Sequence, residues 1–508
     1  MSFFKKYWVF VALGILGVLF FVLRFYNILS LPIFTDEAIY VRWAQIAKQD
    51  SNWRFISLTD GKQPSFIWFS IIALKFIKDP LLASRTVSVF AGFVTFIGMF
   101  FLGRELFRNA AVGLTAAFLF VLYPFALVYD RLAIYDATVA MFAVWGLYVL
   151  VLLTRKVRLD IALIAGMVLG GAVLTKTSGF LSIYLSPLLI LLFDFSKKDL
   201  KNRFVRWTLL LLLTIIFTYI YYSILRLSPF FHIISQKNAI FVYPLSEWFE
   251  HPFRFVFGNL KGLFDWVITY MTVPVFLLSL VSFFVDKKLL REKVFLALWF
   301  FGPLLSLALF GRLLYPRFVY FMTIPLLLLA AYSLYHITLR FKRTYIRVGV
   351  VLLFTILMVR ADISILANLS NAPIPVIDKE QYINGWPAGG GIKESVAFFE
   401  KESQKGKIFV GTQGTFGLMP YAYEIYLDKN PNIKTMGFWP LEHSLPKELV
   451  EAAKTMPTYV VFYQPCPVCE APGVAPKELP LELISTYKKG RKEIHFNIYK
   501  VIPESNER

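Results

Sequence analysis

The chain has 508 residues, of which 57% are hydrophobic and 18% aromatic, while only 17% are charged. A soluble domain carries about 25% charged and about 45–50% apolar residues, so this composition excludes an ordinary soluble protein and indicates a membrane protein. The net charge of +20 would suggest nucleic acid in a soluble protein. Membrane proteins, however, concentrate Lys and Arg in cytoplasmic loops, and we therefore expect no nucleic-acid partner.

The N-terminus predicts an uncleaved first span, because Lys5 and Lys6 precede an uncharged run that is longer than a signal-peptide core. A span needs about 20 apolar residues. By this criterion we expect about eleven transmembrane helices, near residues 8–29, 85–103, 111–128, 137–154, 160–175, 179–195, 207–226, 264–285, 294–311, 316–338 and 345–366.

The charges of the connecting loops predict the orientation. With a cytoplasmic N-terminus, every strongly basic loop falls on the cytoplasmic side, as the positive-inside rule requires. Residues 65–77 are apolar but short, and counting them as a span would invert every later basic loop. We therefore expect a juxtamembrane helix there, within a first extracytoplasmic loop over about 30–84.

The tail beyond residue 366 has a soluble composition and is expected outside the cell. Strand-like runs at 407–412, 459–463 and 494–501 alternate with helix-like stretches at 392–402 and 446–454, a pattern typical of a small α/β domain. The predicted architecture is an all-α polytopic membrane domain at 1–366, followed by an extracytoplasmic α/β domain at 367–508. Within this tail, Cys466 and Cys469 form either a local disulfide or two free thiols, and the glycines at 389–391 indicate a plain turn rather than a phosphate loop.

The predicted extracytoplasmic connections bring acidic and basic side chains to one level of the membrane. Charged groups at bilayer depth cost about 2.5–3.5 kcal/mol each, so we expect a shared site rather than scattered anchors. Two of these residues also have simpler explanations, since Thr35 followed by two acids is a good helix start and a single lysine such as Lys62 can snorkel. The residues concerned are Asp36, Glu37, Lys62, Arg131, Asp136, Lys176, Arg312 and Arg317.

These residue types suit the transfer of a group from a lipid-linked phosphate. Cations at the lipid–water boundary can hold a phosphate whose tail stays in the bilayer, and Arg can bind it bidentately. A nearby carboxylate can accept the proton of an attacking hydroxyl while the cations stabilise the departing phosphate. Residue types alone do not separate this chemistry from the binding of an anionic lipid.

The order of the motifs resembles the C-type glycosyltransferases, specifically the branch of protein O-mannosyltransferases and lipid A aminoarabinose transferases. Asp36-Glu37-Ala38 resembles the acidic signature in the first loop of this family. Gly61-Lys62-Gln63-Pro64-Ser65 resembles its basic-Pro-Pro segment, with Ser in place of the second Pro. Further similar motifs are Arg131 with Asp136, Leu174-Thr175-Lys176, and Arg317-Phe318 with Pro325, where Phe replaces Tyr. The two departures, Ser65 and Phe318, bear on the shape of the donor pocket but remove no charged group.

The resemblance implies inverting transfer of a sugar from a polyprenyl-phosphate donor to an acceptor hydroxyl on the extracytoplasmic face. It makes Asp36 the base, lets Glu37 orient the acceptor or the first-loop helix, and makes Asp136 a supporting or metal-associated carboxylate. Its donor phosphate would be held by Lys62, Arg131, Lys176 and Arg317. Three acids could hold a divalent metal, but the cations already offer neutralisation, so the sequence leaves the metal requirement open.

The expected partners are the polyprenyl-phosphate-linked sugar, membrane lipids, and an acceptor that is a protein, a glycolipid or a polysaccharide. The expected location is the plasma membrane, with a cytoplasmic N-terminus and an extracytoplasmic C-terminal domain. Two other functions stay open at this point. One is a lipid or sugar transporter or flippase, and the other is a catalytically silent scaffold that binds polyprenyl phosphate.

Overall fold

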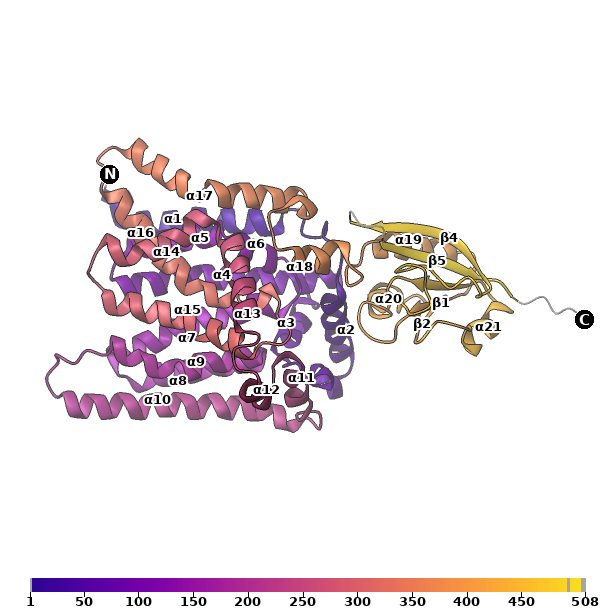
Figure 1. The fold of residues 1–508 in the computed structure, drawn as a ribbon, viewed down its shortest axis with the longest axis horizontal. Coiled ribbons are helices and arrows are strands. Elements are labelled where there is room, and N and C mark those ends of the chain that lie inside the picture. The colour runs from indigo at the N-terminus through magenta and orange to yellow at the C-terminus, as the bar shows by residue number, and fades with distance from the viewer. Residues whose placement is uncertain (1, 491–493, 504–508) are drawn as a thin grey trace, which may run out of the picture.

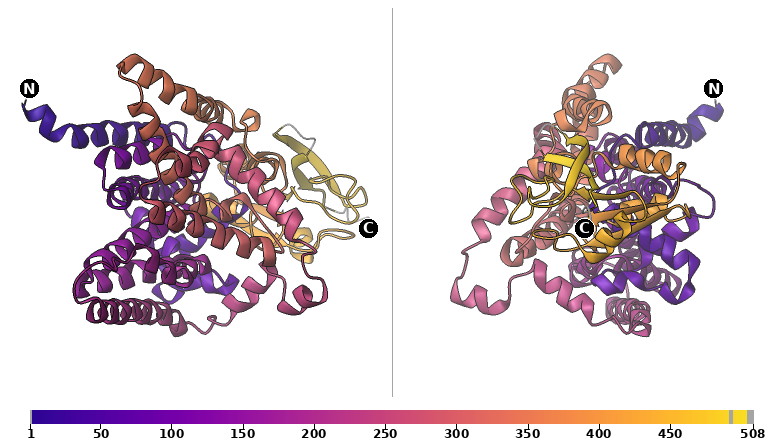
Figure 2. Two further views of the ribbon diagram at one scale, coloured as in Figure 1. Left: turned by 60° about the vertical axis from the view of Figure 1, so that its left-hand side comes forward. Right: turned by 90° about the vertical axis from the view of Figure 1, so that its right-hand side faces the viewer.

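The computed structural model describes residues 2–490 and 494–503. Figure 1 shows a bundle of long helices with a smaller domain, built around a β-sheet, beyond one end of it. In the right-hand view of Figure 2, which looks onto that end of the molecule, the sheet domain lies in front of the helix bundle. We call the end of the bundle nearest the sheet the sheet-domain end, and it positions the candidate site.

Within residues 2–490 and 494–503, seven helical segments are long and apolar enough to cross a membrane, or up to eight if one bent pair counts as a single span. The chain is therefore a multi-pass membrane protein with a mostly helical membrane domain. The seven are α1 (Ser2–Phe25), α4 (Pro80–Phe107), α7 (Tyr135–Lys156), α10 (Leu200–Ser223), α15 (Leu290–Phe310), α16 (Ile324–Leu339) and α17 (Thr344–Ala367).

The remaining four of the eleven predicted spans differ from straight, full-length helices. Pro124 separates α5 (Ala110–Val121) from α6 (Pro124–Tyr129), and α8 (Leu159–Thr175) is an apolar helix of only 17 residues. The candidate span that contains α16 is longer, because it begins at Phe321 and has 19 residues. Residues 177–192 are divided between α9 (Phe180–Tyr184) and 3₁₀ turns. α13 (Val256–Met271) and α14 (Val273–Val285) meet at a bend of 102°. The structure therefore supports seven or eight spans by length and composition, and the prediction of about eleven is too high by that measure.

Short helices gather at the sheet-domain end of the bundle (Figure 1). They are α2 (Thr35–Gln49), α3 (Ser65–Ala73), α11 (Ile233–Phe241) and α12 (Leu245–Glu250). α3 has nine residues, in agreement with the expectation that 65–77 is too short to span. Thr35, which we expected to cap α2, is instead its first residue, and its hydroxyl donates to the carbonyl of Pro387 at 3.1 Å.

The second domain is a five-stranded mixed sheet in the order β2-β1-β3-β5-β4. The strands β1 (Ile408–Gln413), β2 (Ile433–Phe438) and β3 (Thr458–Phe462) are parallel, whereas β4 (Leu481–Lys489) and β5 (Ile494–Val501) pair antiparallel. The three strands and two helices predicted from the sequence are present. The sequence missed β2, β4 and α20 (Tyr421–Leu427), and both missed strands lie at the edges of the sheet, where many side chains are exposed.

Alternate residues of the central strands pack on opposite faces of this sheet. Ile408 and Val410 share a core with α19 (Ile392–Ser403), α20 and the membrane domain. Phe409, between them, packs in a separate cluster with Leu449 of α21 (Lys447–Ala453). Because both faces are covered, β1 and β3 are buried along their whole length and read in sequence as unbroken apolar runs.

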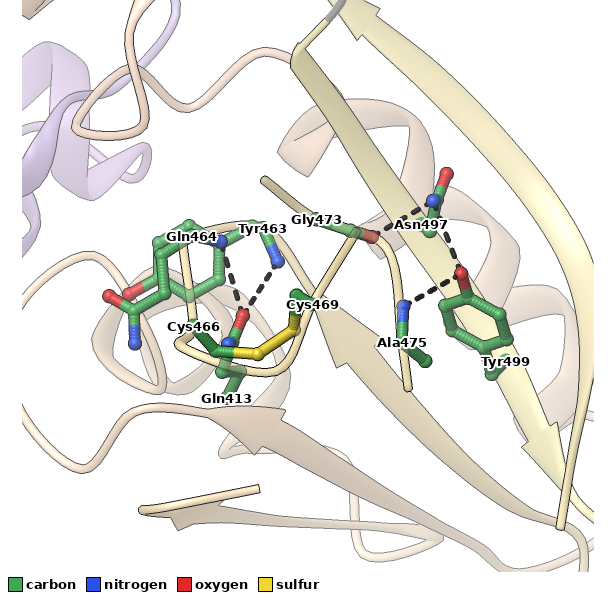
Figure 3. The surroundings of a disulfide bond; sticks show 9 residues. All are labelled: Gln413, Tyr463, Gln464, Cys466, Cys469, Gly473, Ala475, Asn497 and Tyr499. Atoms are coloured by element: carbon green, nitrogen blue, oxygen red, sulfur yellow. Dashed lines mark hydrogen bonds between the residues drawn. A yellow bond between two sulfur atoms is a disulfide. The ribbon is translucent and has the colours of Figure 1, made fainter. Parts of the chain in front are cut away.

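A disulfide between Cys466 and Cys469 closes a short loop after β3 (Figure 3). Of the two alternatives left open by the sequence, the structure therefore has the disulfide. The chain around it is held by side chains of the sheet. The side-chain oxygen of Gln413 accepts hydrogen bonds from the main-chain N–H groups of Tyr463 and Gln464. Asn497 donates a hydrogen bond to the carbonyl of Gly473 at 2.9 Å.

The segment between α17 and the sheet domain packs on the helix bundle. Phe34 pairs with Ala388 in an isolated antiparallel bridge, and the N–H of Thr35 donates to Pro387 at 3.0 Å. Gly389 is required at this junction, because a Cβ there would lie 2.1 Å from the carbonyl oxygen of Ile33. The residues at 389–391 therefore form the expected turn, and the domain division at 366/367 stays a prediction.

Candidate active site

A cavity of about 320 Å³ opens at the sheet-domain end of the bundle, and we call it the first cavity. It lies among α2, the turn before α3, the start of α7, the turn after α8, and α11. Four of the residues singled out from the sequence line it, although they come from four separate connections: Lys62, Asp136, Lys176 and Arg317. Asp36 joins them through ion pairs to two of the cations.

Asp36 lies in the first turn of α2 with its side chain 16% exposed. Arg317 Nη1 donates to its Oδ2 at 2.5 Å, and Lys62 Nζ lies 3.7 Å from its Oδ1. Burial raises the pKa of this carboxyl, but Lys62, Arg317 and Lys176 together outweigh burial and hold the pKa of Asp36 well below its usual range. The carboxylate is therefore ionised at neutral pH and able to accept a proton.

Lys62 is presented by a tight turn. Gly61, just before it, has φ +67°, and a Cβ there would lie 2.6 Å from Cβ of Lys237, so only glycine fits both the backbone and the space. The Lys62 ammonium donates to the hydroxyl of Tyr40 at 2.7 Å and lies 3.8 Å from Asp60. The turn thus places one cation between the two carboxylates Asp36 and Asp60.

Asp136 and Lys176 form a second ion pair on the cavity wall. Asp136 lies in the first turn of α7, and Lys176 interrupts the helical path after α8 with an extended backbone. Their side chains meet at 2.8 Å, and the ammonium also lies 4.7 Å from the ring centre of Phe318. Burial lowers the pKa of Lys176, which Asp136 partly offsets.

Sequence reasoning missed several residues of the site, above all Lys237 of α11. This side chain lines the cavity and donates to Asp60 at 2.6 Å. Tyr40, Gln63 and Asn238 line the cavity as well. Tyr40 and Gln63 lie next to recognised motifs, so their position in the sequence could have indicated that they belong to the site. Nothing in the sequence of the long loop around α11, by contrast, pairs Lys237 with Asp60.

Glu37 points away from the first cavity into a fully buried position. Its carboxylate accepts two hydrogen bonds from Arg85 at 2.7 and 2.8 Å, one from the N–H of Ala133 at 2.7 Å, and one from the N–H of Phe34 at 3.3 Å. Arg85 in turn donates to the carbonyls of Ile28 and other residues of the first loop. These contacts join α2, α4 and the second connection, and no motif in the sequence indicated Arg85.

Arg131 is also separated from the other cations. It lines a second cavity of about 240 Å³ that shares no lining residue with the first. Its Nη2 donates to the carbonyls of Tyr26 and Asn27 at 2.7 and 3.1 Å. The structure thus brings Lys62, Lys176 and Arg317 together and places Arg131 elsewhere. Arg312 is exposed and does not line the first cavity.

A buried carboxyl from the segment after α17 lies close to the site. Asp378, in α18 (Val376–Lys379), accepts hydrogen bonds from the hydroxyls of Tyr129, at 2.8 Å, and Tyr270. Burial raises the pKa of Asp378 to about 7, against the lowering effect of the two hydroxyls and of Arg317. No motif marked this residue, because its role depends on the tail segment folding back onto the bundle.

Among the described residues, no group of three or more His, Cys, Asp or Glu side chains is arranged to hold a metal ion. The acids considered for such a role have other partners, since Asp36 pairs with Arg317, Glu37 with Arg85, and Asp136 with Lys176. The side chains that line the first cavity therefore suit an anion. Its cations are Lys62, Lys176, Lys237 and Arg317.

Comparison with known proteins finds one matching sequence family and several similar folds. Residues 62–222 match the family described as dolichyl-phosphate-mannose-protein mannosyltransferase, whereas no curated protein sequence matches the chain significantly. The fold is similar to that of ArnT from Cupriavidus metallidurans in the apo state, with a TM-score of 0.55 and 12% identity over 98% of both chains. The same enzyme bound to undecaprenyl phosphate gives a TM-score of 0.53 at 13% identity, again over 98% of both chains.

A third similar structure is the archaeal oligosaccharyltransferase AglB from Archaeoglobus fulgidus, in complex with an inhibitory peptide and a dolichol-phosphate. It has a TM-score of 0.52 and 14% identity, over 90% of this chain and 69% of that chain. The resemblance predicted from the motifs is therefore confirmed: residues 62–222 match the dolichyl-phosphate-mannose-protein mannosyltransferase family, and the chain has a fold similar to that of ArnT.

Proposed function

We propose that this protein is an inverting glycosyltransferase that moves a sugar from a polyprenyl-phosphate donor to an acceptor hydroxyl on the extracytoplasmic face. The observation that carries the proposal is the Asp36 carboxylate, which is ionised and held between Arg317 and Lys62 beside the first cavity. The match of residues 62–222 to a mannosyltransferase family makes mannose the first sugar to test.

The transfer step is a displacement at the anomeric carbon of the donor sugar. The acceptor oxygen forms the new bond to this carbon, the bond to the phosphate oxygen breaks, and the hydroxyl proton goes to Asp36. The phosphate leaves with an additional negative charge, which Lys62, Lys176 and Arg317 stabilise. No acid is needed for this leaving group, so one carboxylate suffices for inversion, in contrast to the two carboxylates of inverting glycoside hydrolases.

Donor binding should also activate the base. Arg317 and Lys62 neutralise Asp36, and their charges make it a weak proton acceptor. A donor phosphate competes for the same two cations, and once they turn to the phosphate the pKa of Asp36 rises towards its ordinary value. The carboxylate thereby becomes a stronger base only when a donor is present.

The remaining acids then have supporting roles. Asp136 holds the Lys176 ammonium at the cavity wall, and Glu37 orients α2, and with it Asp36, through its contacts with Arg85 and the main chain. Of the four cations expected to hold the donor phosphate, we retain Lys62, Lys176 and Arg317, because these line the first cavity. The acceptor is a protein, a glycolipid or a polysaccharide.

The test compares wild-type protein with Asp36→Asn and with Asp50→Asn, which makes the same change at the exposed far end of α2. Purified protein is given polyprenyl-phosphate mannose and related lipid-linked sugars, and the release of free polyprenyl phosphate is measured beside donor binding. Loss of a general base predicts a fall in release of about 10²–10⁴-fold for Asp36→Asn. Donor binding should be retained or tightened, because two cations are freed. The Asp50→Asn control should behave as wild type.

Other outcomes point to other functions. Equal release by wild type and Asp36→Asn would take the role of base from Asp36. Donor binding without release from any lipid-linked sugar would favour a silent binder, and movement of intact donor across a sealed bilayer would favour a flippase.

A further inference from the structure

The second cavity, lined by Arg131, lies where the first and last spans end. One wall is formed by residues 28–32 after α1, and the opposite wall by residues 365–370 at the end of α17. Apolar side chains from both walls, such as Leu31 and Leu366, alternate with the polar groups of Ser30, Asn368 and Ser370. The cavity is therefore amphipathic, and it lies beside the ends of two candidate membrane spans, α1 and α17.

Arg131 has no counter-charge in this cavity. It is 8% exposed, its Nε is buried without a hydrogen-bond acceptor, and it forms no ion pair within residues 2–490 and 494–503. Two carbonyls satisfy Nη2, but they do not neutralise its charge. Burial, together with the neighbouring Arg85 and Arg24, lowers the pKa of Arg131 to about 10, so the side chain still carries its charge at neutral pH.

A buried and unpaired cation is unfavourable unless an anion completes the site. The neighbouring cations Arg24 and Arg85 already form ion pairs with Asp130 and Glu37. Arg131 is therefore the cation of this group that lacks a charged partner. A phosphate offers the oxygen acceptors that a guanidinium binds best. The apolar part of the lining would suit the acyl chains attached to such a phosphate.

We propose that the second cavity is a lipid site, in which Arg131 binds the phosphate headgroup of an anionic membrane phospholipid. The bound lipid would pack against residues 28–32, whose carbonyls at Ile28 and Leu31 also accept hydrogen bonds from Arg85. The site is independent of the sugar-transfer proposal, because it shares no lining residue with the first cavity.

The test measures retained lipid by native mass spectrometry after the purified protein is exchanged into detergent containing phosphatidylglycerol or phosphatidylcholine. The variants are Arg131→Gln, Ser370→Trp, which fills the cavity while leaving the contacts of Arg131 intact, and Arg226→Gln, which changes an exposed arginine. We expect Arg131→Gln and Ser370→Trp to lose phosphatidylglycerol at least about tenfold, the loss expected when a charge-assisted hydrogen bond is removed. Wild type and Arg226→Gln should retain it, and phosphatidylcholine should bind more weakly to both.

Three results would overturn the proposal. One is equal retention of phosphatidylglycerol by wild type and Ser370→Trp, a variant that decides the matter even if Arg131→Gln is poorly folded. Another is loss of the lipid in Lys176→Met instead, which would locate it in the first cavity. A third is displacement of the lipid by millimolar inorganic phosphate, which would identify a site for free phosphate rather than for a lipid.

Discussion

The buried ion pair between Glu37 and Arg85 should be essential for the stability of the membrane domain. Both side chains are fully buried, and the carboxylate accepts four hydrogen bonds. The substitution Glu37→Gln keeps the volume but removes the charge, so Arg85 is left without a counter-ion. Breaking one partner of a buried pair typically costs about 3–5 kcal/mol, which is a large part of the stability of most proteins.

The assay is the midpoint of thermal unfolding in detergent, followed by tryptophan fluorescence. Glu105→Gln is the matched control, because Glu105 pairs with Arg155 at 3.0 Å but both side chains are partly exposed, and such pairs contribute about 1 kcal/mol or less. We expect a much lower midpoint for Glu37→Gln than for this control. The double variant Glu37→Met with Arg85→Met should recover part of the loss, since no unpaired charge remains.

An unfolding midpoint of Glu37→Gln equal to that of wild type would contradict an essential role for the Glu37–Arg85 ion pair. If that variant were also unable to transfer sugar, Glu37 would orient the acceptor, which is one of the two roles that the family resemblance implied, rather than hold α2.

Three further predictions concern pH and packing. Burial lowers the pKa of Lys489 to about 7, so the folded state binds fewer protons than the unfolded state between about pH 7 and pH 10.5, and stability should rise with pH across that window. Lys489→Met should flatten this slope in unfolding midpoints measured against pH. For Asp378, whose pKa is raised to about 7, the sign is opposite: stability should fall as pH rises from about 4 to 7, and Asp378→Asn should remove that fall. Finally, a Cβ on Gly113 would lie 2.5 Å from the carbonyl oxygen of Phe100, whereas one on Gly349 meets nothing within 4 Å. Gly113→Ala should therefore destabilise by about 1–3 kcal/mol, while Gly349→Ala should be neutral or stabilising by up to about 1 kcal/mol, as compared by unfolding midpoints.

The spans that could be predicted from the sequence are those whose apolar runs are uninterrupted. Hydropathy reports how apolar a segment is but not whether its helix stays straight. Pro124 is a visible break, and the prediction passed over it. Thr272, where α13 bends into α14 with φ +62°, rarely adopts that backbone conformation and is itself no signal of a bend. Pro274, at the start of α14, does mark the break, and the prediction passed over it as well.

The candidate site was predicted as a set of residue types at one end of the bundle, and three of the four cations expected to hold the donor phosphate meet there. Glu37 could not be separated from Asp36 by sequence, yet neighbours on a helix point roughly 100° apart, so only one of the two can face the cavity. Arg131 and Asp136 come from the same connection but diverge, because the guanidinium binds main-chain carbonyls after α1. Such choices depend on tertiary contacts that no local pattern records.

The bridge between Phe34 and Ala388 has a practical consequence for exchanging domains between related proteins. The helix that carries Asp36 begins against a strip of chain 352 positions further along, through the contact of Thr35 with Pro387. A hybrid joined at the end of α17 would replace that strip with a foreign one and leave α2 without its native support. A hybrid joined after residue 391 would keep the strip with its own helices, and it is the recombination point at which a transplanted sheet domain should leave α2 undisturbed.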